Sequence, residues 1–188
     1  MDLSQHFRIG QAVHMLNGGG VIAYPTEAVW GLGCDPYDFL AVQRLLALKN
    51  RAVAKGVILV AANIEQVEPY LHGLTQAQRQ PLVSSWPGPN TWLIPHNGTA
   101  PDWIRGRFDS VAIRVSAHPV VQGLCQAFGG AIVSTSANPQ GKSPARQAWQ
   151  VRRYFNDALD AIAPGNIGSS AKPSQIRDLL TGQVIRPQ

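Results

Sequence analysis

The chain has 188 residues, of which 45% are hydrophobic and only 14% are charged. This composition excludes a disordered tail and is typical of a globular protein with a full hydrophobic core. The formal net charge is +5. A positive excess on a surface poor in charge favours anionic partners, either a nucleotide or a nucleic acid. Charge alone does not separate these two, nor either of them from a basic surface kept for solubility.

The two cysteines, Cys34 and Cys125, form no C-x-x-C pair and no cluster with histidine. This spacing argues against a zinc site and against a disulfide framework. The first eight residues lack the apolar core of a signal peptide. No apolar run approaches the roughly 20 residues that a membrane-spanning helix needs. We therefore expect a soluble, cytoplasmic protein that does not associate with a membrane.

Helices and buried strands follow one another in the first half of the chain. Ile9, Val13 and Leu16 recur at helical spacing, and the run Asn17-Gly18-Gly19-Gly20 ends that helix. The further elements predicted here are a strand at 21–24, a helix at 39–48, a strand at 57–60 and helices at about 64–71 and 75–84.

The second half continues in the same mixed pattern. Its predicted elements are strands at 91–94 and 111–115, helices at 118–128 and 146–155, a strand at 131–133 and short strands at 175–179 and 183–186. His118-Pro119 is expected to start a helix rather than to take part in catalysis. Because strands and helices mix without strict alternation, we predict a single α/β or α+β domain over residues 1–188 with a mixed sheet.

Several familiar catalytic motifs are absent. The triple glycine follows a helix and precedes a strand, the reverse of the order in a Rossmann turn or a P-loop. The chain has no G-x-x-x-x-G-K-[ST] and no G-x-S-x-G, so neither a P-loop nor an α/β-hydrolase triad has support. The five histidines lack ligand spacing.

The segment 24–33 is a first candidate for a site, because ligands in α/β proteins often bind where a buried strand ends. Thr26 offers a donor and an acceptor, and Glu27 could bind a metal, orient a cation or act as a base. Gly31 and Gly33 allow a tight turn or a close approach of the backbone. A plain turn with Thr26 and Glu27 in capping roles is equally compatible with these residue types.

A second candidate is the cluster of Lys49, Arg51 and Lys55. If this segment is extended, alternation places the three cations on one side, where they are solvent-accessible and can neutralise phosphate. Composition alone favours a solvated basic loop instead.

Two further segments carry small polar side chains. Trp86-Pro87-Gly88-Pro89 is a rigid turn that would hold Thr91 at the start of a strand, although a structural turn with Trp86 in the core explains it as well. Ser134, Ser136 and Asn138 alternate after an apolar strand, so an extended chain places them on one side. Such groups suit a small polar substrate or a ribose and phosphate. An ordinary Asn-Pro turn is the alternative.

Taken in order, these segments resemble the YrdC/TsaC family, the L-threonylcarbamoyladenylate synthases. The resemblance runs from about residue 9 to Arg186 and implies an α/β, YrdC-like domain whose twisted, mixed parallel and antiparallel sheet is flanked by helices and has a basic concave face. The length is similar to that of the short bacterial form. The markers are Tyr24-Pro25-Thr26-Glu27, Lys49-x-Arg51, Trp86-Pro87-Gly88-Pro89, Ala112-Ile113-Arg114-Val115, Ser136-Ala137-Asn138 and Pro173-Ser174.

The resemblance implies a reaction that joins L-threonine, bicarbonate and ATP into threonylcarbamoyl-AMP and pyrophosphate, with Mg²⁺ accompanying ATP. The product would serve the threonylcarbamoylation of adenosine next to the anticodon of tRNA. The implied partners are other proteins of that pathway, with tRNA or double-stranded RNA as a further one. No protein nucleophile is required, which agrees with the missing triads.

The resemblance also assigns roles to single residues. It implies Lys49 and Arg51 for stabilising charge during catalysis. It implies a set of ATP-binding residues, Arg51, Lys55, Thr91, Ser136, Asn138 and Arg186. It implies a set of threonine-binding residues, Thr26, Ser134, Ser174 and Arg114. Metal ligands are not identified. The chain departs from the commonest family pattern at Lys55-Gly56, around Val60 and at 140–145.

Two other functions remain open at this stage. A non-catalytic RNA-binding or ribosome maturation factor would also carry a positive charge, although interleaved aromatic residues on a basic strand are missing. A carbamoyl-adenylate-forming module, as in hydrogenase maturation enzymes, would share the domain. The additional zinc-finger-like and acylphosphatase regions of those enzymes are absent from this sequence.

Overall fold

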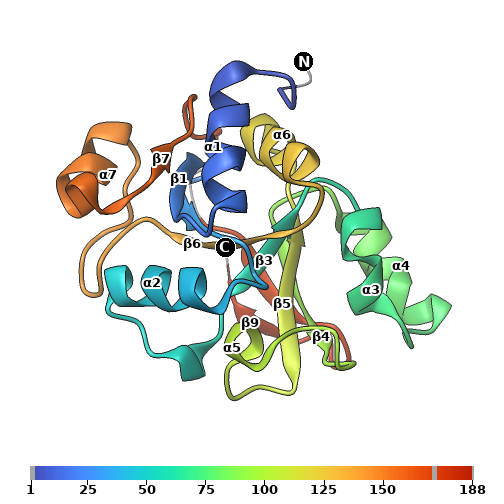
Figure 1. Ribbon diagram of the computed structural model, residues 1–188. Coiled ribbons are helices and arrows are strands. Elements are labelled where there is room, and N and C mark those ends of the chain that lie inside the picture. Colours follow the sequence, from blue (N-terminus) through green and yellow to red (C-terminus); the bar gives the residue numbers. More distant parts are fainter. Residues whose placement is uncertain (1–2, 171–172, 188) are drawn as a thin grey trace.

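The structure is a computed structural model that describes residues 3–170 and 173–187 (Figure 1). Within these residues, nine strands form one sheet in the order β7-β1-β2-β6-β3-β5-β4-β8-β9. The strands are β1 Ile22–Pro25, β2 Trp30–Gly33, β3 Ile58–Ala61, β4 Asn90–Pro95, β5 Ser110–Val115, β6 Ile132–Ser136, β7 Ala161–Ile162, β8 Gln175–Asp178 and β9 Val184–Arg186. The helices are α1 Phe7–Asn17, α2 Phe39–Lys49, α3 Glu68–Leu71, α4 Gln76–Ser85, α5 Asp102–Arg105, α6 Pro119–Phe128 and α7 Ala148–Phe155.

The sheet is mixed, as the sequence predicts. β3 pairs with β5, β4 with β8 and β1 with β7 in parallel, and the remaining pairs are antiparallel. The central strands β6, β3 and β5 are therefore brought together from distant parts of the chain. Residues that end these strands can then meet in one place, although the sequence separates them widely.

Local signals set the ends of the helices. The backbone N–H of Gly18 donates to carbonyls of the last turn of α1, which confirms the predicted stop. His118 precedes α6, and its side chain accepts a hydrogen bond from Val120 N, so its predicted role at the helix start is also confirmed. The other ring nitrogen of His118 lies 3.0 Å from Asn166 O.

The side chains of each central strand point alternately to two separate hydrophobic cores. Ile132 and Val60 pack in the core that α1 and α6 cover, whereas Val133 and Leu59 pack in the larger core beneath α2 and α7. Figure 1 shows α1 and α6 side by side over β1. Burial of each such side chain contributes ~1.5–3 kcal/mol to stability. This alternation determines which residues remain for a site.

The part of the α1/α6 face that the two helices leave uncovered carries the polar residues. Along β6, Ser134 and Ser136 follow Ile132 at a spacing of two, and along β5 Arg114 lies opposite Val60 of β3. These side chains therefore point to the same side of the sheet as Ile132 and Val60. The sheet thus has one face that is apolar under the helices and that, beyond them, carries polar side chains beside apolar ones such as Ile58.

Strand β2 is an element that the sequence does not predict. Its four residues contain Gly31 and Gly33, and glycine is poor in strand interiors, so periodicity favours a loop there. β2 is fixed instead by its neighbours, since it pairs antiparallel with both β1 and β6. A Cβ on Gly33 would lie 2.5 Å from Val133 O and 2.8 Å from the Tyr24 ring, so only glycine fits.

The predicted absence of a disulfide agrees with the structure, because Cys34 and Cys125 are both free and buried. Over residues 3–170 and 173–187, no helix combines the length and apolar character needed to cross a bilayer.

A pair of glycine substitutions tests the packing around β2. We expect Gly33→Ala to lower the free energy of unfolding by ~1–3 kcal/mol, because the added methyl must push the Tyr24 ring or the Val133 carbonyl aside. Gly10→Ala is the matched control, since nothing lies within 4 Å of its added Cβ in the exposed face of α1. It should raise stability by ~0.5–1 kcal/mol. Denaturant unfolding measures both, and equal effects would contradict the packing described.

Candidate functional site

A cavity of about 430 Å³ opens on the uncovered part of the sheet. Its walls come from the turn after β1, the segment after α2, the strands β3, β5 and β6, and the C-terminal strands. Among the described residues, its lining contains five cationic side chains and one carboxylate, that of Glu27. The cations are Arg51, Lys55, Arg105, Arg114 and Arg186. A cavity with this balance of charge attracts anions.

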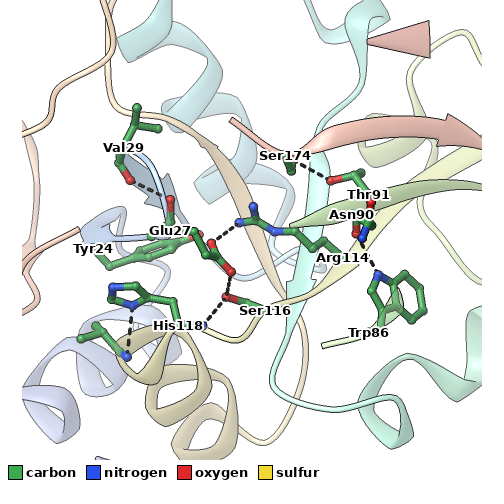
Figure 2. Close-up of polar contacts among 12 residues, drawn as sticks. Tyr24, Glu27, Val29, Trp86, Asn90, Thr91, Arg114, Ser116, His118 and Ser174 are labelled. Carbon is green, nitrogen blue, oxygen red and sulfur yellow. Dashed lines mark hydrogen bonds and ion pairs between the residues drawn. The ribbon is translucent and has the colours of Figure 1, made fainter. Parts of the chain in front are cut away.

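Glu27 and Arg114 form a buried ion pair in one wall of the cavity. Arg114 Nη2 lies 3.4 Å from Glu27 Oε2, and the two side chains are 9% and 13% exposed. Figure 2 shows Glu27 between Arg114 and Ser116, whose hydroxyl donates to Glu27 Oε1 at 2.6 Å. Burial raises the pKa of the Glu27 carboxyl, but the Arg114 charge and the Ser116 hydroxyl lower it more, so its net pKa lies below the ordinary value.

Thr26 combines the two roles that its residue type allows. Its hydroxyl donates to Val29 O at 2.7 Å and its backbone N–H donates to the same carbonyl at 3.1 Å, so it closes the turn between β1 and β2. The side chain is almost completely buried yet lines the cavity. The predicted turn role is therefore confirmed, and the binding role keeps its geometric basis.

The extended conformation under which alternation would place Lys49, Arg51 and Lys55 on one side is not the one observed. Lys49 is the last residue of α2, Asn50 adopts a left-handed conformation, and Val53–Lys55 is a 3₁₀ turn. Arg51 and Lys55 nevertheless both line the cavity. The Arg51 guanidinium donates to Gly56 O at 2.9 Å, and burial lowers the pKa of Arg51. The tight turn, rather than strand alternation, brings these two cations together.

Lys49 does not have the predicted solvent-accessible position. The residue is 5% exposed and lies outside the set of described residues that line the cavity. Its ammonium group donates to Ser136 O and, at 2.8 Å, to Asn138 O. Burial, and then the charge of Arg51, lower the pKa of Lys49 to about 8, so the group stays largely protonated at pH 7. Lys49 therefore ties the end of α2 to the loop after β6.

Of the three polar residues predicted to share one side, Ser134, Ser136 and Asn138, only the two serines line the cavity. Ser134 and Ser136 line the cavity, as alternation predicts. Asn138 does not join them, because its side-chain amide donates to Pro139 O and to Lys142 O, at 3.1 and 2.8 Å. The chain turns at this point, so period-two alternation stops before Asn138. The predicted placement of all three on one side is therefore wrong for Asn138.

Thr91 is also further from the cavity than predicted. It is fully buried, and its hydroxyl lies 2.9 Å from the hydroxyl of Ser174, which does line the cavity (Figure 2). Arg186 donates to Ser174 O at 2.7 Å and faces the cavity from β9. The predicted ATP-binding and threonine-binding residues are thus interleaved in this wall.

The cavity also has an apolar end that the sequence does not reveal. The apolar side chains in the lining include Ile58, Ile104, Phe108, Ile176 and Ile185. Phe108 and Ile185 are 45% and 53% exposed. No motif marks these residues, because the fold brings them to one cavity from β3, α5, the loop between α5 and β5, β8 and β9. An apolar end next to cations suits a flat base attached to phosphates.

No group of three or more His, Cys, Asp or Glu side chains within residues 3–170 and 173–187 could hold a metal ion. Glu27 is the single acidic side chain in the described lining, and both its oxygens face Arg114 or Ser116. The described lining thus places five cationic side chains against one carboxylate that is already paired.

The fold and the cavity together define an α/β protein with a mixed sheet and a cavity rich in cationic side chains along its central strands. The sequence profile of the Sua5/YciO/YrdC family, described as "Telomere recombination", matches residues 14–187. The chain therefore belongs to the Sua5/YciO/YrdC family.

Two relatives of similar length are the threonylcarbamoyl-AMP synthases of Cellvibrio japonicus and Pseudomonas aeruginosa. The first is 60% identical over 187 residues, covering 100% of this chain and 99% of that protein. The second is 56% identical over 181 residues, covering 96% and 97%. Among solved structures, P. abyssi Sua5 complexed with L-threonine has a TM-score of 0.89 at 30% identity. That match covers 95% of this chain and 53% of P. abyssi Sua5.

The reassigned role of Lys49 can be tested by stability. We expect Lys49→Ala to lower the free energy of unfolding by ~2–3 kcal/mol, because two carbonyls lose a charged donor. Lys55→Ala is the matched control in the same segment, and because Lys55 is exposed its loss should change stability by less than ~0.5 kcal/mol. Thermal or denaturant unfolding provides the measurement. A Lys49 variant as stable as the control would return Lys49 to the predicted solvent-facing role.

Proposed function

We propose that this protein makes threonylcarbamoyl-AMP and pyrophosphate from L-threonine, bicarbonate and ATP. The observation that carries the proposal is one cavity that joins hydrogen-bonding groups around Arg114 and Ser134 to the cations Arg51 and Lys55. Such a site suits a reaction that must hold two anions together. Relatives at 56% and 60% identity over almost the whole chain carry the name of this activity.

The polar end of the cavity would bind L-threonine. The Arg114 guanidinium can hold the α-carboxylate through parallel hydrogen bonds. Thr26, Ser134 and Ser174 would contact the amine and the hydroxyl, because all three line the same cavity as Arg114. The structure of P. abyssi Sua5, at 30% identity, contains L-threonine, which supports an amino-acid site in this fold.

The cationic and apolar parts would bind ATP. Arg51, Lys55, Ser136 and Arg186 would contact phosphates or ribose, and the apolar end at Phe108 would accept the base. Mg²⁺ would arrive with ATP, since phosphate oxygens and water supply most ligands of this ion in nucleotide sites. The described lining offers one carboxylate, already paired, so the residues present fit a metal held mainly by the substrate.

Some predicted residues would act indirectly. We propose that Thr91 positions Ser174 through their contact at 2.9 Å. Lys49 and Asn138 would fix the loop that presents Ser136, because both form hydrogen bonds to its backbone or that of the residues following it. They would therefore affect turnover through the shape of the ATP end.

The chemistry needs no protein nucleophile. The threonine amine adds to bicarbonate and water leaves, which gives an N-carboxylate. An oxygen of that carboxylate attacks the α-phosphorus of ATP, and the bond to pyrophosphate breaks. Charge accumulates on the phosphorus oxygens and on the leaving group, and Arg51 and Lys55 are placed to stabilise it.

The product is a mixed anhydride of a carbamate and AMP, a reactive acyl donor. It suits a later transfer to an amine, and we propose the adenosine next to the anticodon of tRNA as acceptor, with other tRNA threonylcarbamoylation proteins completing that step. Residues 1–188 would form one domain, since strands from β1 to β9 share one sheet.

The direct test incubates the protein with ATP, Mg²⁺, bicarbonate and L-threonine and measures pyrophosphate. We expect release that requires L-threonine and stops when a chelator removes Mg²⁺. L-serine or carbamoyl phosphate is supplied in place of L-threonine in parallel reactions, and a preference for L-threonine separates this activity from a carbamoyl-adenylate-forming module. A folded protein that releases no threonine-dependent pyrophosphate would refute the proposal, and salt-dependent RNA binding in that case would favour the RNA-binding alternative.

Arg51 provides a residue-level test. We expect Arg51→Ala to lower kcat/KM by about 100-fold, because a positioned donor to developing phosphate charge is lost. Its stability should fall by only ~1 kcal/mol from the lost contact with Gly56 O. Arg79→Ala is the control, since Arg79 pairs with Glu68 outside the cavity lining. Steady-state kinetics with equal turnover in both variants would remove Arg51 from the site.

A further inference from the structure

Arg114 is a buried cation with incomplete partners. Its side chain is 9% exposed, its Nε has no hydrogen-bond partner among the described residues, and it lines the cavity. A buried guanidinium is costly unless its donors are satisfied. Figure 2 shows the guanidinium directed at Glu27, and Glu27 is the one ion-pair partner that Arg114 has among the described residues.

Arg114 also faces other positive charges. Burial lowers the pKa of the Arg186 guanidinium, and the nearby Arg114 charge lowers it further, so the two cations repel each other across the cavity. Glu27 is the one carboxylate in the described lining that opposes this repulsion. Without Glu27, the repulsion between Arg114 and Arg186 would be unbalanced and would favour a different orientation of the Arg114 side chain.

Glu27 is itself held rigidly. Ser116 donates to Glu27 Oε1 at 2.6 Å, and the same hydroxyl oxygen accepts the backbone N–H of His118 at the start of α6, at 3.1 Å. The backbone carbonyl of Glu27 accepts from Ser170 N at 3.1 Å. Hydrogen bonds thus fix both the side chain and the backbone of Glu27. A residue that orients another side chain must itself be held in this way.

These contacts also decide between the roles that the residue type allows. Glu27 Oε1 accepts a hydrogen bond from Ser116, whereas Oε2 is buried without a hydrogen-bond partner among the described residues and lies 3.4 Å from the Arg114 charge. That charge and the Ser116 hydroxyl lower the pKa of the carboxyl, so it is a weak base toward the substrate amine. The same engagement disfavours a role as metal ligand. Orientation of a cation is the role left.

We propose that Glu27 is a positioning residue for the amino-acid end of the reaction: it holds the Arg114 guanidinium in the orientation that binds the carboxylate of the amino-acid substrate. Ser116 connects that pair to the start of α6, because its hydroxyl group bonds both Glu27 Oε1 and the backbone N–H of His118. The inference deepens the proposed function and rests on it, because the amino acid is taken to be the ligand of Arg114.

The test compares Glu27→Gln with wild type in the pyrophosphate assay. Gln keeps the shape and can still accept from Ser116, but it cannot neutralise Arg114. We expect KM for L-threonine to rise about tenfold or more, because the interaction that orients the binding group is lost. KM for ATP should change by less than about twofold, because its proposed contacts lie elsewhere. Glu68→Gln, a Glu to Gln change in an ion pair outside the cavity, should change neither value.

A double-mutant cycle separates positioning from a general structural role. If Glu27 acts through Arg114, adding Glu27→Gln to Arg114→Ala should raise KM for L-threonine by less than about twofold further. Equal effects of Glu27→Gln with and without Arg114 would overturn the proposal, as would an unchanged KM for L-threonine in the single variant.

Two further outcomes are also decisive. If Glu27→Gln does not fold, Ser116→Ala takes its place and should raise KM for L-threonine selectively; an unchanged value would then overturn the proposal. A wild-type protein without threonine-dependent pyrophosphate release would refute the proposed function itself, whereas an active wild type with an unaffected Glu27→Gln variant would refute the positioning role alone.

Discussion

The alternation of side chains along the central strands is the constraint on which the rest of the structure depends. Each strand must supply apolar residues to two cores at once, one under α1 and α6 and one under α2 and α7. The two helices of the first layer cover only part of their face. Beyond the helices, Ser134 and Arg114 point to the same face as Ile132 and Val60. Ser134 lies two residues after Ile132 on β6, and Arg114 is the β5 partner of Val60. The site is thus the uncovered continuation of a core face.

The cations in and beside the cavity follow a second rule, that buried cations need partners. Arg51 is held by backbone carbonyls, Lys49 by carbonyls of the opposite loop, and Arg114 by Glu27. These contacts use some donors and leave others to face the cavity. A site built in this way suits the proposed reaction, in which two bound anions must be held together and charge develops on phosphate. The absence of a nucleophile motif in the sequence is consistent with that design.

The sequence predicted the long, periodic elements well, because helix spacing and apolar runs are local signals. It failed where tertiary contacts override them. β2 contains two glycines and is a strand because β1 and β6 pair with it on both sides. The segment after Lys49 turns because α2 ends with a left-handed Asn50 and a 3₁₀ turn follows. Asn138 does not share the side of Ser134 and Ser136, because the chain turns after Ser136 and the Asn138 amide donates to nearby carbonyls.

By itself, the sequence determined the helices and most strands, the class of fold, the family resemblance and the identity of the polar and cationic groups, since periodicity, composition and ordered motifs are properties of the chain. Only the tertiary structure decided which of those groups meet. A turn brings Arg51 and Lys55 to the cavity, whereas Lys49 is buried outside it. Glu27 pairs with Arg114, which lies 87 residues later in the chain, on β5. Such pairings depend on the packing of the whole sheet, which no local pattern encodes.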